Sequence, residues 1–292
     1  MKKALITGGM GFVGRHLTRR LCADGWQVAA LERPKTPRLR FKGLRCHDYD
    51  GTSRGMIRLL QAAKPDVVFH LAALYVSEHG PDDIRPLIES NVLLGCQLAE
   101  AMAQSGTRLL VNTGTSWQHF QDAPYDPVNL YAATKQACED VLAYYQEARG
   151  LKTIHLQLFD TYGPDDARPK LLAALRRAAE QEVAFSAGRQ FIDLVHIDDV
   201  VEAFVQAGRR LLSGKVRKSE TYAVSSGRPQ TLRAVTGLFE KALGRPLKIR
   251  WGERPYRFRE VMRPWSQGRR LPGWRPRISL EKGFSSLLRN SR

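Results

Sequence analysis

The stretch ALITGGMGFVG, residues 4–14, decides the fold of this 292-residue chain. Its short apolar run predicts a buried first strand over residues 3–7, and the apolar side chains after it predict a helix over residues 12–24. Glycines between a first strand and a first helix permit a tight turn and close packing of helix on strand. They also let a pyrophosphate approach the helix N-terminus. The stretch therefore predicts the start of a dinucleotide-binding sheet.

The rest of the chain alternates short aliphatic runs with longer helical patterns. Strands are expected at 3–7, 27–32, 43–47, 66–71, 108–113 and 153–158, and helices at 12–24, 52–63, 84–105, 129–149 and 168–181. This alternation predicts an α/β fold with a Rossmann-type, doubly wound parallel sheet. The pattern loosens after about residue 160. We expect a dinucleotide-binding domain over 1–160 and a smaller, mainly substrate-binding lobe over 161–292, with some later segments returning to the first domain.

The composition is strongly basic. Lys and Arg number 46 against 29 Asp and Glu, which gives a formal net charge of +17. Such a charge suits nucleic acid, an anionic surface or an anionic small substrate. Arginines and aromatic residues interleave between residues 245 and 277, as in single-strand binders, but no RNP, KH or helix-turn-helix signature accompanies them.

The first apolar run begins directly after Met-Lys-Lys, and its short length indicates a buried strand and not a signal peptide. We therefore expect a cytoplasmic protein. No apolar run reaches the roughly 18 residues of a membrane span. Four widely separated cysteines predict reduced thiols, with neither a zinc site nor a disulfide framework: Cys22, Cys46, Cys96 and Cys138.

Glu32 and Arg33 stand at the end of the second expected strand and give opposite signals about the cofactor. An acid there binds the adenosine ribose hydroxyls of NAD, whereas an arginine accommodates the 2′-phosphate of NADP. Lys35 and Arg38 add positive charge nearby, so the balance favours NADP(H), with NAD(H) or dual use open.

A second motif, YAATK at residues 131–135, follows the strand that ends in VNTGTS, residues 111–116. On a helix, Tyr131 and Lys135 share one face. The reference pKa of tyrosine, about 10, is too high for a base at neutral pH. A neighbouring ammonium favours the phenolate, so the pair suits proton transfer.

Together these motifs resemble the extended branch of the short-chain dehydrogenase/reductase superfamily, whose glycine spacing is matched by Gly8, Gly11 and Gly14. Three later segments resemble those of NAD(P)-dependent nucleotide-sugar epimerases, dehydratases and reductases: LFDTYGPDDARPK (158–170), FIDLVHIDDV (191–200) and LPGWRPRISLEKGF (271–284). The resemblance covers nearly the whole chain.

The resemblance implies roles for individual residues. Thr115, Tyr131 and Lys135 match the catalytic triad, and Lys135 also holds the nicotinamide ribose. The expected cofactor-binding residues are Gly8, Gly11, Phe12, Val13, Gly14, Glu32, Arg33, Asp48, Leu71, Ala72, Ala73, Asn91, Tyr131 and Lys135. The expected substrate-binding residues are Ser116, Trp117, Asp160, Arg168, Lys170, Arg257 and Arg259.

Two departures from the family pattern stand out. Asp160 replaces an asparagine that contacts the sugar diphosphate, and an ionised acid would repel a phosphate. Ser116 and Trp117 replace the acidic residue that follows the catalytic threonine in dehydratases. We therefore expect no 4,6-dehydration.

The implied function is an NAD(P)-dependent oxidoreductase that acts on a nucleotide-activated sugar, foremost by reducing a 4-keto group. A nucleotide-sugar 4-epimerase with retained NAD is the alternative, followed by a non-catalytic NAD(P)-binding redox sensor and a basic nucleic-acid binder. The expected partners are a nucleotide sugar and a second copy of the chain, which would dimerise through the helices at 84–105 and 129–149. Nucleic acid and membrane are not expected partners.

Overall fold

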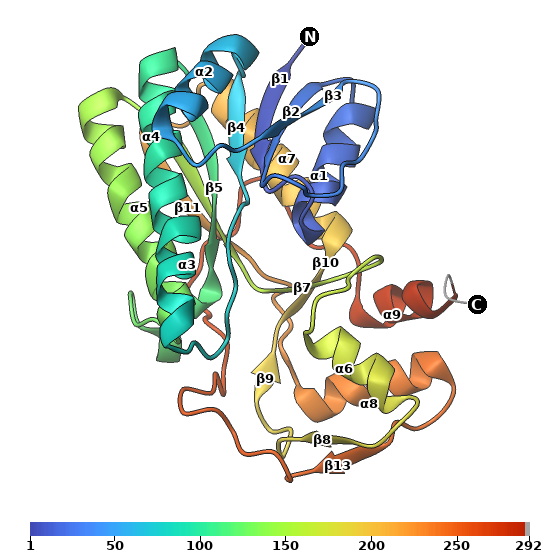
Figure 1. Ribbon diagram of the computed structural model, residues 1–292. Coiled ribbons are helices and arrows are strands. Elements are labelled where there is room, and N and C mark those ends of the chain that lie inside the picture. Colours follow the sequence, from blue (N-terminus) through green and yellow to red (C-terminus); the bar gives the residue numbers. More distant parts are fainter. Residues whose placement is uncertain (290–292) are drawn as a thin grey trace.

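A computed structural model describes residues 1–289, and its centre is a parallel sheet of seven strands in the order β11-β6-β5-β4-β1-β2-β3 (Figure 1). Every neighbouring pair in this sheet is parallel. The strands are β1 (Lys3–Thr7), β2 (Gln27–Glu32), β3 (Leu44–Asp48), β4 (Val67–His70), β5 (Leu109–Thr115), β6 (Lys152–Leu158) and β11 (Ser219–Val224). The predicted Rossmann-type, doubly wound sheet is confirmed.

Helices cover both faces of the sheet. One face carries α2 (Ser53–Ala63), α4 (Leu94–Ser105) and α5 (Leu130–Arg149), and the other carries α1 (Phe12–Ala23) and α7 (Ile197–Leu212). Two buried apolar clusters fill the layers between helices and sheet. The fully buried Phe69 belongs to the first, and Gly208 on α7 gives its ring room, because a Cβ at residue 208 would lie 2.8 Å from the ring. Burying one such ring contributes roughly 1.5–3 kcal/mol.

The helix expected over 84–105 is interrupted. A short α3 (Ile84–Ile88) runs into one π-helical segment, Glu89–Leu93, before α4 begins. Asn91 lies in that segment with its side chain fully buried, and its amide is hydrogen-bonded to the backbone of Leu74 and to the Thr134 hydroxyl. π-Bulges are frequent at functional sites. The helix expected over 168–181 is also shorter, because α6 (Leu171–Ala178) begins only after Pro169.

A smaller lobe lies below the sheet in Figure 1. It contains α6, α8 (Leu232–Leu243), α9 (Leu280–Arg289), the parallel pair β8 (Val183–Phe185) and β13 (Ile249–Trp251), and the antiparallel pair β9 (Phe191–Ile192) and β12 (Gln230–Thr231). A third apolar cluster that includes Tyr162, Phe239 and Phe284 fills this lobe. β7 (Asp160–Tyr162) pairs with β10 (Leu194–His196) between the lobe and the sheet. The domain boundary near residue 160 stays a prediction, although α7 and β11 do return to the sheet.

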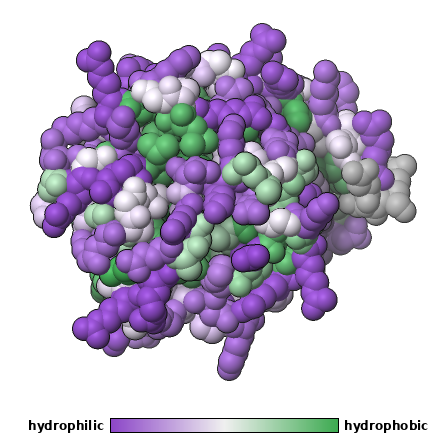
Figure 2. Space-filling model, turned by 90° about the horizontal axis from the view of Figure 1, so that it is seen from above, coloured by the Kyte–Doolittle hydropathy of each residue, from purple (hydrophilic) through white to green (hydrophobic). Residues whose placement is uncertain are grey.

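The surface seen from above in Figure 2 is largely hydrophilic, with apolar side chains in separate small patches. Over residues 1–289, no helix combines the length and apolar character needed to cross a bilayer. The same residues contain no group of three or more His, Cys, Asp or Glu side chains placed to hold a metal ion. The four cysteines are free thiols.

Candidate active site

The glycine-rich loop joins β1 to α1 and packs as tightly as its sequence predicts. Gly8 has φ of 71°, a left-handed conformation that favours glycine, and a Cβ there would lie 2.8 Å from the Ala72 backbone. A Cβ on Gly14 would meet the carbonyl oxygen of Gly8. Met10 and Phe12 are buried, and Gly11 is the N-cap of α1. The loop thus leaves its backbone close to the N-terminus of α1, where a pyrophosphate binds in such folds.

Glu32 turns into this loop. Its Oε1 accepts a hydrogen bond of 3.0 Å from the Met10 backbone N–H, and the side chain is 7% exposed. Burial raises the pKa of Glu32, against the lowering effect of the Met10 and Gly9 N–H groups. Arg33 is exposed, and Asp48, at the end of β3, forms an ion pair of 2.6 Å with Arg38. Glu32 is therefore the member of this group held against the dinucleotide loop.

The loop after β4 passes beside Gly8 and is held by hydrogen bonds with Thr7 and Asn91. The Ala72 N–H donates to the Thr7 hydroxyl, which also shares a hydrogen bond of 2.7 Å with Nδ1 of the buried His70. Asn91 Oδ1 accepts from the Leu74 N–H, and its Nδ2 donates to the Leu74 carbonyl. Because its amide is used in these contacts, Asn91 positions the Leu71-Ala72-Ala73 segment. Direct binding of the cofactor by Asn91 stays a prediction.

Thr115 ends β5, and Tyr131 and Lys135 lie in the first turns of α5. Asn129 caps α5 through the Ala132 N–H, and its Nδ2 donates to the carbonyls of Val76 and Ser77. The start of α5 is thereby tied to the loop that follows β4. This contact holds Tyr131 at the carboxyl edge of the sheet, where ligands bind in open α/β folds.

The electrostatics of Tyr131 differ from the sequence expectation. Burial raises the pKa of Tyr131, with a smaller contribution from Tyr75, and the positive charge that opposes this effect is that of Arg168. The expected lowering of the Tyr131 pKa by Lys135 is not seen: the charged and polar groups that shift this pKa are Tyr75 and Arg168, and burial has the largest effect. Tyr131 is therefore protonated at neutral pH and suited to donate a proton.

Lys135 is the clearest sign that a polar ligand belongs here. The residue is fully buried, and its Nζ has no hydrogen-bond partner among the described residues. Buried ammonium groups are ordinarily paired, so the unpaired donor needs an acceptor from outside the chain. A ribose hydroxyl of a nicotinamide dinucleotide supplies one. With the tight glycine loop, this orphaned donor shows that the residues present fit such a cofactor.

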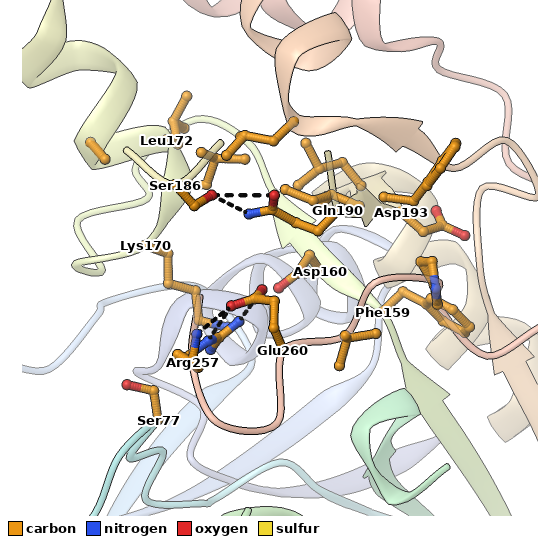
Figure 3. A pocket seen from close by; sticks show the side chains of 18 of the residues that line it. Ser77, Phe159, Asp160, Lys170, Leu172, Ser186, Gln190, Asp193, Arg257 and Glu260 are labelled. Carbon is orange, nitrogen blue, oxygen red and sulfur yellow. Dashed lines mark hydrogen bonds and ion pairs between the residues drawn. The ribbon is translucent and has the colours of Figure 1, made fainter. Parts of the chain in front are cut away.

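A cavity of about 450 Å³ opens beside these residues, between the sheet edge and the smaller lobe (Figure 3). Ser116 and Trp117 line it, as does Tyr75, whose ring packs edge-on against the Tyr131 ring with centroids 5.1 Å apart. Burial raises the pKa of Tyr75 to about 12. Tyr75 thus joins the predicted catalytic tyrosine to the cavity.

Several charged side chains line the cavity. Lys170 Nζ lies 4.3 Å from the centroid of the Tyr75 ring and forms neither a hydrogen bond nor an ion pair within residues 1–289. Burial lowers the pKa of Lys170, and the nearby Asp160 raises it. The Arg257 guanidinium forms two hydrogen bonds of 3.0 and 3.1 Å with Glu260 and lies over the Trp117 ring. Figure 3 shows Lys170, Asp160 and this pair around one space.

Two of the expected substrate-binding arginines lie elsewhere. Arg168 is hydrogen-bonded to Asp166 and lies 4.1 Å from the centroid of the Phe12 ring, on the side of the glycine loop. Arg259 pairs with Asp126, and it is not among the cavity-lining residues. The sequence treats Arg257 and Arg259 as equivalent, and only the first reaches the cavity wall.

Several cavity residues carry no motif that marks them in the sequence. They include Tyr75, Ser186, Gln190, Glu260 and the stacked pair His119 and Trp265, whose ring centroids are 3.9 Å apart. Tyr75 could have been found from the sequence because it lies two residues after Ala73. The others come from three separate segments that only the tertiary fold brings together.

Comparison with known proteins identifies the family. The model of the NAD dependent epimerase/dehydratase family matches residues 4–224. The chain belongs to this family. It is therefore an NAD(P)-dependent enzyme of the extended short-chain dehydrogenase/reductase type, as the sequence motifs predict.

Curated relatives match over nearly their full length. A UDP-glucose 4-epimerase of Mycolicibacterium smegmatis is 28% identical over 97% of this chain and 96% of the relative. A CDP-abequose synthase of Salmonella muenchen is 26% identical over 98% and 97%. Among solved structures, MoeE5 in complex with UDP-glucose and NAD is 26% identical with a TM-score of 0.86, covering 99% of this chain and 98% of that one.

Proposed function

We propose that this family member is a nucleotide-sugar oxidoreductase that works at C4 of the sugar, with 4-epimerisation as its reaction. The observation that carries the proposal is the unpaired, fully buried Lys135 on the same helix face as Tyr131, beside a cavity lined with cations. The similarity to a UDP-glucose 4-epimerase over nearly both whole chains supports it.

In this proposal each residue of the triad has one task. Tyr131 exchanges a proton with the 4-oxygen of the sugar, and Thr115 hydrogen-bonds the same oxygen. Lys135 donates to the nicotinamide ribose and orients it. When bound, the dinucleotide accepts and returns hydride. The glycine loop, the Leu71-Ala72-Ala73 segment and Glu32 would hold it.

We propose NAD(H) as the cofactor. The buried carboxylate of Glu32 at the glycine loop suits ribose hydroxyls and would repel a 2′-phosphate. The sequence analysis favours NADP(H) because of Arg33. The relatives do not support this choice, since the structure of MoeE5 contains NAD. A fluorescence titration with NADH and NADPH decides, and tighter binding of NADPH would overturn the choice.

The substrate is proposed to be a nucleoside diphosphate sugar. Arg177, Arg254 and Lys170 line the cavity and form no ion pair in the described part of the chain, so they are available to a diphosphate. Asp160 lines the same cavity near Lys170, where a carboxylate can accept hydrogen bonds from sugar hydroxyls (Figure 3). In this proposal, the aspartate that replaces the family's asparagine at residue 160 binds the sugar and not the diphosphate.

The test is incubation of the purified protein and NAD with UDP-, CDP-, dTDP- and GDP-hexoses. We expect 4-epimers by NMR with no net change in nicotinamide absorbance. Absence of any epimer with every nucleotide hexose would refute epimerisation.

The 4-keto reductase expected from the sequence is the second candidate. Ser116 and Trp117 line the cavity directly after Thr115, so no acid stands in the place where dehydratases of this family carry one. Hydride and proton exchange at C4 needs only the triad and the cofactor. Stoichiometric loss of NADH with a 4-keto-6-deoxy sugar nucleotide would favour this candidate, and formation of such a sugar from an intact hexose would contradict both.

We also propose a homodimer through α3, the π-helical segment and α5. Ile84, Ile88 and Leu93 are 48%, 44% and 44% exposed, and Tyr144 on α5 is 59% exposed. Apolar side chains exposed on neighbouring helices are typical of a protein interface. Light scattering of the wild type and of Leu93→Asp should show a dimer and a monomer, respectively.

A further inference from the structure

A buried polar cluster lies behind the triad, between α5 and the sheet. Glu139 follows Tyr131 and Lys135 on α5 at the same spacing of four residues, so all three side chains share one face of the helix. The Glu139 side chain is 12% exposed, and it does not line the cavity. The proposed reaction gives this carboxylate no direct task.

Hydrogen bonds connect Glu139 to the backbone of Thr115. Glu139 Oε1 accepts from Gln118 Nε2 at 3.3 Å and from Gln157 Nε2 at 3.1 Å. Gln118 Oε1 in turn accepts from the Thr115 N–H at 2.9 Å. One side chain therefore separates the carboxylate from the residue that is expected to hold the substrate oxygen.

The glycine at position 114 of β5 leaves room for the Glu139 carboxylate. Gly114 precedes Thr115 on β5, and a Cβ at that position would lie 2.7 Å from Glu139 Oε1 and would collide with Gln157 Oε1. Any larger residue would push the carboxylate away from the strand. Glu139 thus packs against the β5 backbone at the point where the strand delivers Thr115.

Charge connects the same carboxylate to Lys135. The titratable groups that interact with Lys135 are Cys138 and Glu139 on α5, His70 on β4 and His155 on β6. Burial raises the pKa of the Cys138 thiol, and it lowers the pKa of His155 and brings that of His70 to about 3. These three groups are therefore neutral near pH 7, and Glu139, whose Oε2 lies 3.7 Å from His155 Nδ1, is the one carboxylic acid in this set.

We propose that Glu139 is a positioning residue of the active site: it fixes Thr115 through Gln118, and its carboxylate keeps the buried ammonium of Lys135 protonated. The inference rests on the proposed roles of Thr115 and Lys135. Burial lowers the pKa of Lys135, and the negative charge of Glu139 opposes that effect. Without it, Lys135 would lose its proton at a lower pH.

The first test needs neither cofactor nor substrate. The Lys135 ammonium is titrated by lysine side-chain NMR in the wild type, Glu139→Gln and Glu147→Gln, with Lys135→Met to assign the signal. Glu147 lies on the same helix, is 66% exposed and pairs with Lys218, so it is a matched control. We expect the midpoint to fall by about one pH unit or more in Glu139→Gln alone. Equal midpoints in wild type and Glu139→Gln would overturn the proposal.

The second test is kinetic. In Glu139→Gln, kcat should fall about tenfold or more with KM within about twofold of wild type, and the alkaline limb of the kcat profile should move to lower pH with the NMR midpoint. If kcat falls but the alkaline limb does not move, Glu139 has only a structural role, and the proposed effect of its charge on Lys135 is refuted. If the wild type turns over no sugar nucleotide, the proposed function fails, and the NMR titration still decides this inference.

Discussion

At the scale of single residues, Tyr131 shows what burial does to a proposed catalytic group. Its phenol is desolvated and its pKa is raised, so the protonated form is stable. Removal of that proton requires a positive charge or an acceptor close by. In the proposed function, the unpaired ammonium of Lys135 and a bound dinucleotide would supply this environment, so we expect the proton transfer to depend on cofactor binding.

Tyr131→Phe should lower turnover by roughly 10²–10⁴-fold while NADH binding stays nearly unchanged, because only the proton-transferring hydroxyl is lost. Lys135→Met should impair both. Steady-state assays and NADH fluorescence titrations measure the two effects. A Tyr131→Phe enzyme with most of its activity would show that another group transfers the proton.

Glu32 offers a prediction about pH. Burial raises the pKa of Glu32, so the folded protein is most stable when this side chain is a neutral carboxylic acid. That stability is lost as pH rises through the folded-state pKa and the side chain ionises. Glu32→Gln, neutral at every pH, should therefore raise the melting temperature of the cofactor-free protein at neutral pH and weaken NADH binding. The gain in melting temperature should shrink as pH falls towards 4.5, the ordinary pKa of a glutamate side chain. A gain that is constant over this range would contradict the assignment.

At the scale of elements, β5 and α5 together carry the triad, and their contact depends on the glycine before Thr115. Gly114→Ala should lower the free energy of unfolding by about 1–3 kcal/mol, since the new methyl group meets two buried polar side chains. Chemical denaturation measures this loss. Gly237→Ala on α8 is the control, because nothing lies within 4 Å of its Cβ position. Equal stability of Gly114→Ala and wild type would mean that Glu139 moves freely.

The sequence predicts these elements well because their signals are local. Apolar runs and glycines place β1, β2, β5, α1 and α5 within one or two residues. The π-helical break at Asn91 could not be predicted, because its cause is a side chain drawn inward to Leu74 and Thr134, which lie far away in sequence. Arg257 and Arg259 are likewise distinguished only by Glu260 and Asp126, their partners in the folded chain.

At the scale of the whole molecule, the cavity lies between the sheet and the smaller lobe, and residues far apart in the sequence line it. Tyr75 and Trp117 follow β4 and β5 on the sheet side, and Lys170, Arg257 and Glu260 come from segments of the smaller lobe. Cations of the lobe lie on aromatic rings of the sheet side, an arrangement that desolvation strengthens. Substrate affinity should therefore depend on residues that have no part in the proton transfer.

Lys170 is the residue on which this division can be tested. Its Nζ has no ion-pair or hydrogen-bond partner in the described chain, and it reaches the Tyr75 ring that packs on Tyr131. Lys170→Met keeps much of the apolar stem, so we expect KM for the sugar nucleotide to rise about tenfold with kcat within about threefold of wild type. Arg176→Met on α6, the helix whose N-cap is Lys170, is the control, because Arg176 lies away from the cavity and should leave both constants unchanged. A fall in kcat at constant KM would instead make Lys170 part of the chemical step, acting on Tyr131 through Tyr75.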